Sequence, residues 1–142
     1  MEDIFENSVT TCVTHGRGYV YSLQYHIVWC IKYRKEILTG SLADEVKQHL
    51  LATANDLQIT IDAMEVMPDH IHLLVSCKPQ ARLSDAIKVF KGNTARWLFL
   101  AHPELKSSLW GGHMWNPSYF VATVSDRSAE QVARYIEEQK TK

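Results

Sequence analysis

The chain has 142 residues, of which 46% are hydrophobic and 22% charged, proportions typical of one folded domain spanning residues 1–142. No apolar run approaches the roughly 18 residues of a membrane span and the first residues carry no secretion signal, so we expect a cytoplasmic protein without membrane contact. With 15 Lys and Arg against 16 Asp and Glu, the chain lacks the bulk positive charge of proteins that coat nucleic acid.

The charges are unevenly distributed along the chain. Residues 36–69 contain seven acidic residues and one basic residue, a net charge of −6, whereas residues 78–106 contain six basic and two acidic residues, a net charge of +4. We therefore expect an anionic partner to contact the second half of the chain.

The first predicted elements follow a loose leader over residues 1–16. Residues 17–31 are expected to form a long strand, because large apolar side chains occupy its odd-numbered positions. A helix then begins with Ser41 as its N-cap. Its buried stripe is predicted to consist of Leu42, Val46, Leu50, Ala54 and Leu57.

A hairpin, a helix, a strand and a last helix are predicted for the rest of the chain. Apolar residues alternate on both sides of the turn residues Pro68 and Asp69, which predicts the hairpin. The capping pair Ser128 and Gln131 predicts where the last helix begins. The predicted elements cover residues 58–66 with 70–77, residues 84–100, residues 118–124 and residues 128–140.

This order of elements, β-α-β-β-α-β followed by an extra helix, is that of the split βαβ, ferredoxin-like fold of the α+β class. The fold has a four-stranded antiparallel sheet with helices on one face. We expect the first and third strands side by side at its centre, and we expect the extra C-terminal helix to carry functional side chains.

His70 and His72 lie two positions apart in the second strand of the hairpin. Alternate residues of a strand point to the same side, and Ile71, Leu73 and Val75 are expected to face the helix-covered core. The two imidazoles are therefore expected on the open face of the sheet, where they can hold a metal ion. The alternative is a pair of solvated or hydrogen-bonded surface histidines, because short motifs often match by chance.

Tyr135 and Gln139 are four residues apart in the predicted last helix, so they project from one face about 40° apart. If this helix covers the open sheet face, Gln139 offers an amide oxygen to the metal ion and Tyr135 presents a phenol beside it. A phenol, with an ordinary pKa near 10, needs activation before it attacks a phosphate. Two imidazoles and an amide oxygen suit Mg²⁺ or Mn²⁺. The alternative is a tyrosine packed on the sheet and a glutamine in solvent.

Basic and aromatic side chains elsewhere are candidates for contact with nucleic acid. A phosphate backbone can lie along a basic helix face, although such charges are often merely solvated. Tryptophans beside a Gly-Gly turn can stack on unpaired bases, although they more often pack a loop onto a core. The candidates are Lys88, Lys91 and Arg96 in the second predicted helix, Lys32, Arg34 and Lys35 after the first strand, and Trp110 and Trp115.

Five segments resemble those of the single-tyrosine HUH transposases of the insertion-sequence two-hundred class. They are YHIVWCIKYR over residues 25–34, MPDHIHLLV over 67–75, WGG over 110–112, WNPSYF over 115–120 and YIEEQ over 135–139. The segments are spread over nearly the whole chain, and their combination is far more specific than any one of them.

The resemblance implies a transposase that moves a mobile element as single-stranded DNA. His70, His72 and Gln139 then bind Mg²⁺ or Mn²⁺, and Tyr135 attacks the DNA phosphodiester to give a 5′-phosphotyrosine and a free 3′-hydroxyl. Relatives of this class recognise hairpins near the ends of the element. They act as homodimers in which the tyrosine helix crosses to the partner, so that each active site is composite.

Two other functions are compatible with the sequence. One is that of a domesticated relative that processes chromosomal repeats, which only the genomic surroundings distinguish from an element's own enzyme. The other is that of a non-catalytic ferredoxin-like module that binds RNA or DNA on its open sheet face. Independently of the resemblance, excision of an element requires two cuts at once, so one convincing tyrosine per chain favours a dimer.

Overall fold

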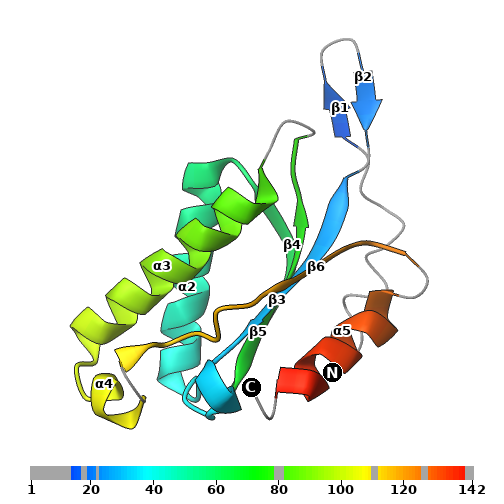
Figure 1. Cartoon of the computed structure of the whole chain (residues 1–142). Helices are drawn as coiled ribbons and strands as arrows, with labels where there is room; N and C mark the ends of the chain where they lie inside the picture. Colours follow the sequence, from blue (N-terminus) through cyan, green and yellow to red (C-terminus); the bar gives the residue numbers. More distant parts are fainter. Residues whose placement is uncertain are drawn as a thin grey trace.

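The computed structural model of the chain describes residues 14–16, 19–21, 23–78, 82–109, 112–125 and 128–139. Within these residues, the main sheet consists of β3 (Gln24–Cys30), β4 (Thr60–Met67), β5 (His70–Ser76) and β6 (Phe120–Thr123). The helices are α2 (Ser41–Leu57), α3 (Leu83–Ala101), the short α4 (Leu105–Ser108) and α5 (Ser128–Glu138) (Figure 1). None of these helices is both long and apolar enough to cross a membrane.

The four-stranded sheet is antiparallel, with the strand order β4-β5-β3-β6. β3 and β5, the first and third of these strands along the chain, lie side by side at its centre, which confirms the predicted ferredoxin-like topology. The register pairs Val28 with His72 and Cys30 with His70. Both histidines therefore lie on a strand that has neighbours on its two sides.

Helices α2 and α3 cover one face of the sheet (Figure 1). Alternate side chains of β3 and β5 face these helices, among them Trp29 and Ile71, which are fully buried. The ring of Trp29 stacks against Phe90 of α3, with the ring centroids 6.1 Å apart. Val46 and Leu50, from the predicted stripe of α2, are buried in the same core. The intervening side chains of the two strands therefore point to the opposite face.

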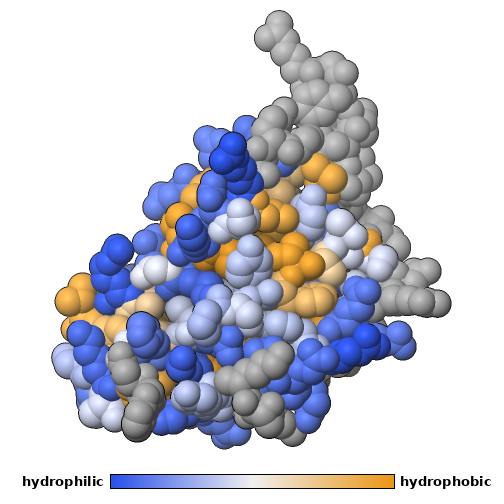
Figure 2. All heavy atoms as spheres, viewed as in Figure 1, coloured by the Kyte–Doolittle hydropathy of each residue, from blue (hydrophilic) through white to orange (hydrophobic). Residues whose placement is uncertain are grey.

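Helix α5 lies on that opposite face, against β3 and β6 (Figure 1). Val132 is buried on its inner side, whereas Glu130 and Arg134 are exposed. Figure 2 shows hydrophilic side chains over α5 and apolar side chains over the strands between α3 and α5. The last helix therefore covers the open face of the sheet, which is the condition on which the roles of Tyr135 and Gln139 depend.

The strand predicted over residues 17–31 is interrupted in the structure. Residues Tyr19–Tyr21 form β2, which pairs with β1 (Thr14–Gly16) in a separate two-stranded sheet. The pairing of β3 with β5 begins at Gln24, whereas the residues of β2 pair with β1. The alternation of side chains continues across this break and does not reveal it. β1 occupies the end of the predicted leader, whose first 13 residues lie outside the described part.

The predicted N-cap of the first long helix is displaced by one residue. Gly40 is the N-cap of α2, with a φ of 59°, a conformation that glycine adopts without steric cost, and Ser41 is the first helical residue. Ser128 is likewise the first residue of α5, and its hydroxyl donates to the Ser125 carbonyl at 2.8 Å. The serines therefore mark where the helices begin.

Candidate active site

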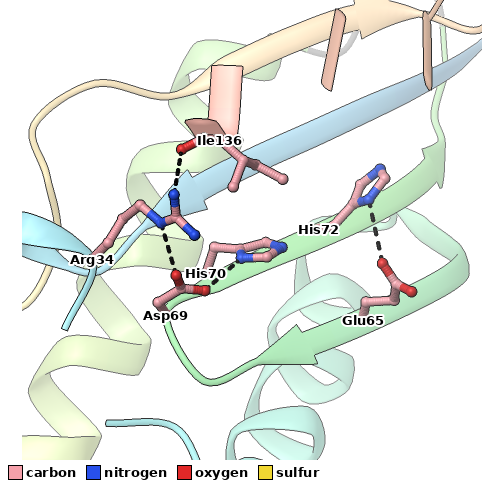
Figure 3. A network of polar contacts seen from close by, with 6 residues as sticks. All are labelled: Arg34, Glu65, Asp69, His70, His72 and Ile136. Atoms are coloured by element: carbon pink, nitrogen blue, oxygen red, sulfur yellow. Dashed lines mark hydrogen bonds and ion pairs between the residues drawn. The ribbon is translucent and has the colours of Figure 1, made fainter. Parts of the chain in front are cut away.

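His70 and His72 project from the beginning of β5 toward the side on which α5 lies (Figure 3). His72 is only 7% exposed, and the side chain of His70 is 12% exposed. The alternation of side chains correctly predicted their common face. The structure buries both rings and gives each of them polar partners, so they are not solvated surface groups.

One carboxylate orients His70. Asp69 Oδ1 lies 2.8 Å from His70 Nδ1, and Asp69 Oδ2 accepts a hydrogen bond from Arg34 Nε at 2.7 Å (Figure 3). Burial lowers the pKa of His70, so the ring is neutral at pH 7. Burial alone raises the pKa of Asp69, but the bonds from His70 and Arg34 outweigh it and hold that pKa below its ordinary value. The carboxylate therefore accepts a hydrogen bond from Nδ1–H of His70, and the lone pair of the ring is on Nε2.

His72 lies between two polar neighbours. Its Nε2 is 2.9 Å from Nδ1 of His26 on β3, and its Nδ1 is 3.6 Å from Oε1 of Glu65 on β4. Burial, together with the neighbouring histidines, lowers the pKa of His72 to about 3, and burial also lowers that of His26. Both rings are therefore neutral at pH 7, and the N–H of one ring donates a hydrogen bond to the unprotonated nitrogen of the other.

The chemical types of these side chains suit a divalent cation, although Nε2 of His72 is in contact with His26 Nδ1 in this structure. The described residues include no group of three or more His, Cys, Asp and Glu side chains arranged around a metal position. Neutral imidazoles are nevertheless the form that binds metals, and a carboxylate behind the ring is the usual second contact of a metal-binding histidine. Asp69 supplies that contact to His70, and Glu65 approaches His72. An amide oxygen from Gln139 would complete a set of neutral donors.

Tyr135 and Gln139 converge on Ser118, in the loop before β6. The Tyr135 hydroxyl lies 2.7 Å from Ser118 Oγ, which in turn lies 3.5 Å from Gln139 Oε1. The ring of Tyr135 packs against Phe120, with the centroids 5.5 Å apart. Gln139 is only 3% exposed, so the alternative of a glutamine in solvent is wrong, whereas the tyrosine does pack on a strand residue.

The loop that carries Ser118 is held by hydrogen bonds. The backbone N–H and the hydroxyl of Ser118 both donate to Asn116 Oδ1 at 3.0 Å. Lys91 of α3 donates to the carbonyls of Asn116, Pro117 and Ser118 at 2.9, 3.3 and 3.2 Å. Burial raises the pKa of Tyr135, an effect that the bond to Ser118 partly offsets. The phenol is therefore neutral at pH 7 and fixed in position.

Arg34 connects the two halves of this site. Its Nη1 donates to the carbonyl of Ile136 at 3.1 Å, while its Nε holds Asp69 (Figure 3). The sequence analysis did not identify Asp69, Glu65 or Ser118 as parts of the site. The hairpin itself carried a signal for Glu65, because a tight turn at residues 68–69 sets this residue opposite His72.

Several candidate DNA contacts have partners within the chain. Trp115 is 8% exposed, its indole N–H donates to the Lys91 carbonyl, and its ring packs into the core. Lys35 donates to the Ser108 carbonyl, and Lys32 lies over the ring of Tyr33. The remaining candidates are Lys88 and Arg96, which are exposed on α3, and Trp110, which lies outside the described residues.

Comparison with known sequences gives the family of the chain. Residues 19–139 match the family described as "Transposase IS200 like". The ISDra2 transposase TnpA of Deinococcus radiodurans is 50% identical over 127 residues, which cover 89% of this chain and 91% of that protein. The transposase for insertion sequence element IS200 of Salmonella typhimurium is 28% identical over 119 residues, which cover 84% of this chain and 78% of that protein.

Solved structures agree with this assignment. The crystal structure of a putative transposase from Deinococcus radiodurans has a TM-score of 0.83 and 46% identity, over 89% of this chain and 97% of that one. A REP-associated tyrosine transposase bound to a REP hairpin shares the fold, with a TM-score of 0.56 and 14% identity over 84% of this chain and 67% of that one. Because the family match extends over most of the sequence, the chain belongs to the IS200-like transposases.

Proposed function

We propose that this transposase cleaves and rejoins single-stranded DNA with Tyr135 as its nucleophile and with Mg²⁺ or Mn²⁺ held by His70, His72 and Gln139. The observation that supports this proposal is the position of α5. The helix carries Tyr135, lies on the sheet face of the two histidines, and is hydrogen-bonded through Arg34 to the carboxylate that orients His70. The nucleophile and the candidate ligands therefore belong to one side of the molecule.

The proposed reaction is an exchange of phosphodiester partners. Tyr135 Oη bonds to phosphorus and the bond from phosphorus to the 3′-oxygen breaks, which leaves a 5′-phosphotyrosine and a 3′-hydroxyl. The phenol proton passes to solvent water, and the departing 3′-oxygen takes up a proton from solvent. A bound Mg²⁺ or Mn²⁺ supplies polarisation of a phosphoryl oxygen and screens its charge. Attack of a 3′-hydroxyl on the phosphotyrosine reverses these bonds, so joining needs no external energy source.

We also propose that the protein recognises DNA hairpins at the element ends as a homodimer with composite active sites. The REP-associated relative of the same fold is bound to a REP hairpin, and Lys88 and Arg96 on α3 offer exposed positive charge to phosphates. Two simultaneous cuts require two tyrosines, which two chains supply.

The nucleophile is tested by trapping its covalent product. The protein is incubated with Mn²⁺ and labelled single-stranded DNA that carries an end of the element, and the products are separated on a denaturing gel. We expect a protein–DNA adduct with the wild type and none with Tyr135→Phe, because only the attacking hydroxyl is removed. Tyr119→Phe removes a hydroxyl from an exposed tyrosine and is the matched control. Absence of the adduct with the wild type, or its persistence in Tyr135→Phe, would contradict the proposed function.

A further inference from the structure

Arg34 uses one guanidinium group for two contacts that lie on different parts of the fold. Nε donates to Asp69 Oδ2 at 2.7 Å and Nη1 donates to the Ile136 carbonyl at 3.1 Å (Figure 3). The other oxygen of Asp69 lies 2.8 Å from His70 Nδ1. An unbroken series of hydrogen bonds therefore runs from the backbone of α5 to the ring of His70.

The carbonyl that Arg34 contacts lies in the last turn of a helix. α5 ends at Glu138, and carbonyls in the last turn of a helix commonly accept from groups outside the regular helical pattern. A cation at this end also interacts favourably with the helix dipole. Arg34 therefore caps the end of the helix directly beside Tyr135.

The backbone at Arg34 adopts a conformation that most residues avoid. Tyr33 and Arg34 have φ values of 59° and 53°, in the left-handed region that is unfavourable for side chains with a Cβ. The turn is fixed at its beginning, where the Lys32 N–H donates to the Met114 carbonyl at 3.0 Å, and the Arg34 N–H donates to the Ile31 carbonyl at 2.7 Å. The Arg34 side chain is only 18% exposed, so this strained turn presents a largely buried cation.

We propose that Arg34 is a positioning residue that fixes the tyrosine helix relative to His70. The fixed separation of Nε and Nη1 in the planar guanidinium sets the distance between Asp69 and the end of α5. A lysine at this position has the charge, but its donors lie on a single atom at the end of a flexible stem, so it does not fix the separation between the two partners. This inference rests on the proposed function for its consequence in catalysis, but the contact itself is testable without DNA.

The test compares Arg34→Lys with a matched control variant, Arg82→Lys. Arg82 is an exposed arginine at the N-terminal end of α3. Three quantities are measured: hydrogen exchange of the α5 amides, Mn²⁺ affinity by calorimetry, and the rate of adduct formation. In Arg34→Lys we expect exchange in the last turn of α5 to be at least about tenfold faster. We expect Mn²⁺ to bind about tenfold more weakly and the adduct to form about 100-fold more slowly. Arg82→Lys should match the wild type in all three.

The outcomes separate this inference from the proposed function. Wild-type exchange in α5 of a folded Arg34→Lys variant would overturn the positioning role, even if adduct formation were slow. Failure of the wild type to form an adduct would contradict the proposed function. Hydrogen exchange of the α5 amides and the Mn²⁺ affinity would still decide whether Arg34 is a positioning residue. Thermal unfolding of each variant verifies that it is folded, and Arg34→Gln, which keeps a planar donor without the charge, serves as the second variant if Arg34→Lys does not fold.

Discussion

The hydroxyl of Ser118 determines how the Tyr135 phenol is held. The Ser118 hydroxyl lies 3.0 Å from Asn116 Oδ1 and 2.7 Å from the Tyr135 hydroxyl, and either hydroxyl can be the donor in the shorter bond. Burial makes ionisation of the phenol harder, and the bond to Ser118 makes it easier. When the phenol loses its proton, Ser118 can turn its own proton toward the phenolate. This serine therefore favours the reactive form of the nucleophile.

Replacement of Ser118 by alanine should slow adduct formation without weakening DNA binding. A hydrogen bond to a charged group contributes about 1.5–3 kcal/mol, so we expect a decrease of about 10- to 100-fold in the single-turnover rate. The alkaline rise of the rate should move to higher pH, because burial raises the pKa of Tyr135 and loss of Ser118 removes the bond that partly offsets this rise. Rates measured across neutral and alkaline pH test both expectations.

The control for this serine is Ser107→Ala, which removes a hydroxyl that donates to the Glu104 carbonyl on the surface. It should keep the wild-type rate and pH profile. If Ser118→Ala also kept both, the hydroxyl would have no part in the ionisation of Tyr135.

At the scale of elements, β3 contributes a neutral group to the sheet beneath the site. Cys30, its last residue, is fully buried. Burial and the charge of Asp69 raise the pKa of the Cys30 thiol to about 12. An ionised Cys30 would raise the pKa of Tyr135 further. The strand therefore keeps a negative charge away from the Tyr135 phenol, where the proposed reaction brings a phosphate.

The Cys30 thiol should resist alkylation as long as the protein is folded. The ordinary pKa of a thiol is 9.0, and that of Cys30 is raised to about 12. At pH 9, roughly one thousandth of the Cys30 thiols are therefore ionised in the folded protein, and only the thiolate reacts. We expect iodoacetamide to label Cys30 several hundredfold more slowly in the native protein than in guanidinium, as measured by peptide mass spectrometry. Similar rates in the two states would show that the thiol is accessible and ionised.

The regular elements of the site were predictable from local spacing. The alternation in β5 placed His70 and His72 on one face, and the four-residue spacing placed Tyr135 and Gln139 on one side of a helix. Both predictions depend only on the geometry of a single strand or helix.

The contacts between elements were not predictable in this way. Arg34 and Ile136 are 102 positions apart, and neither residue carries a spacing signal that points to the other. Glu65 meets His72 only through the register of the hairpin. The left-handed turn at Arg34 involves residues that rarely adopt it. The packing of the elements against one another is therefore not predictable from these spacings. This packing decides which polar groups contact the site residues.

At the scale of the whole molecule, α5 packs on the sheet of its own chain, next to β6. In the proposed homodimer the same helix serves the partner, where it can make the same contacts, as in domain swapping. Residues 124–127 connect β6 to α5, and four residues span at most about 14 Å. A dimer with composite sites must therefore bring the partner's histidines close to β6, at the edge of the sheet.

Mixing two inactive variants distinguishes a composite site from one built within a single chain. Tyr135→Phe keeps the histidines and His70→Ala keeps the nucleophile, so neither alone should form an adduct. If α5 crosses between chains, each mixed dimer has one complete site, and random mixing should restore about a quarter of the wild-type adduct. Differently tagged chains should show the DNA on the His70→Ala chain, which carries the intact tyrosine. No adduct in the mixture would mean that each tyrosine serves its own chain, as α5 is docked in this structure.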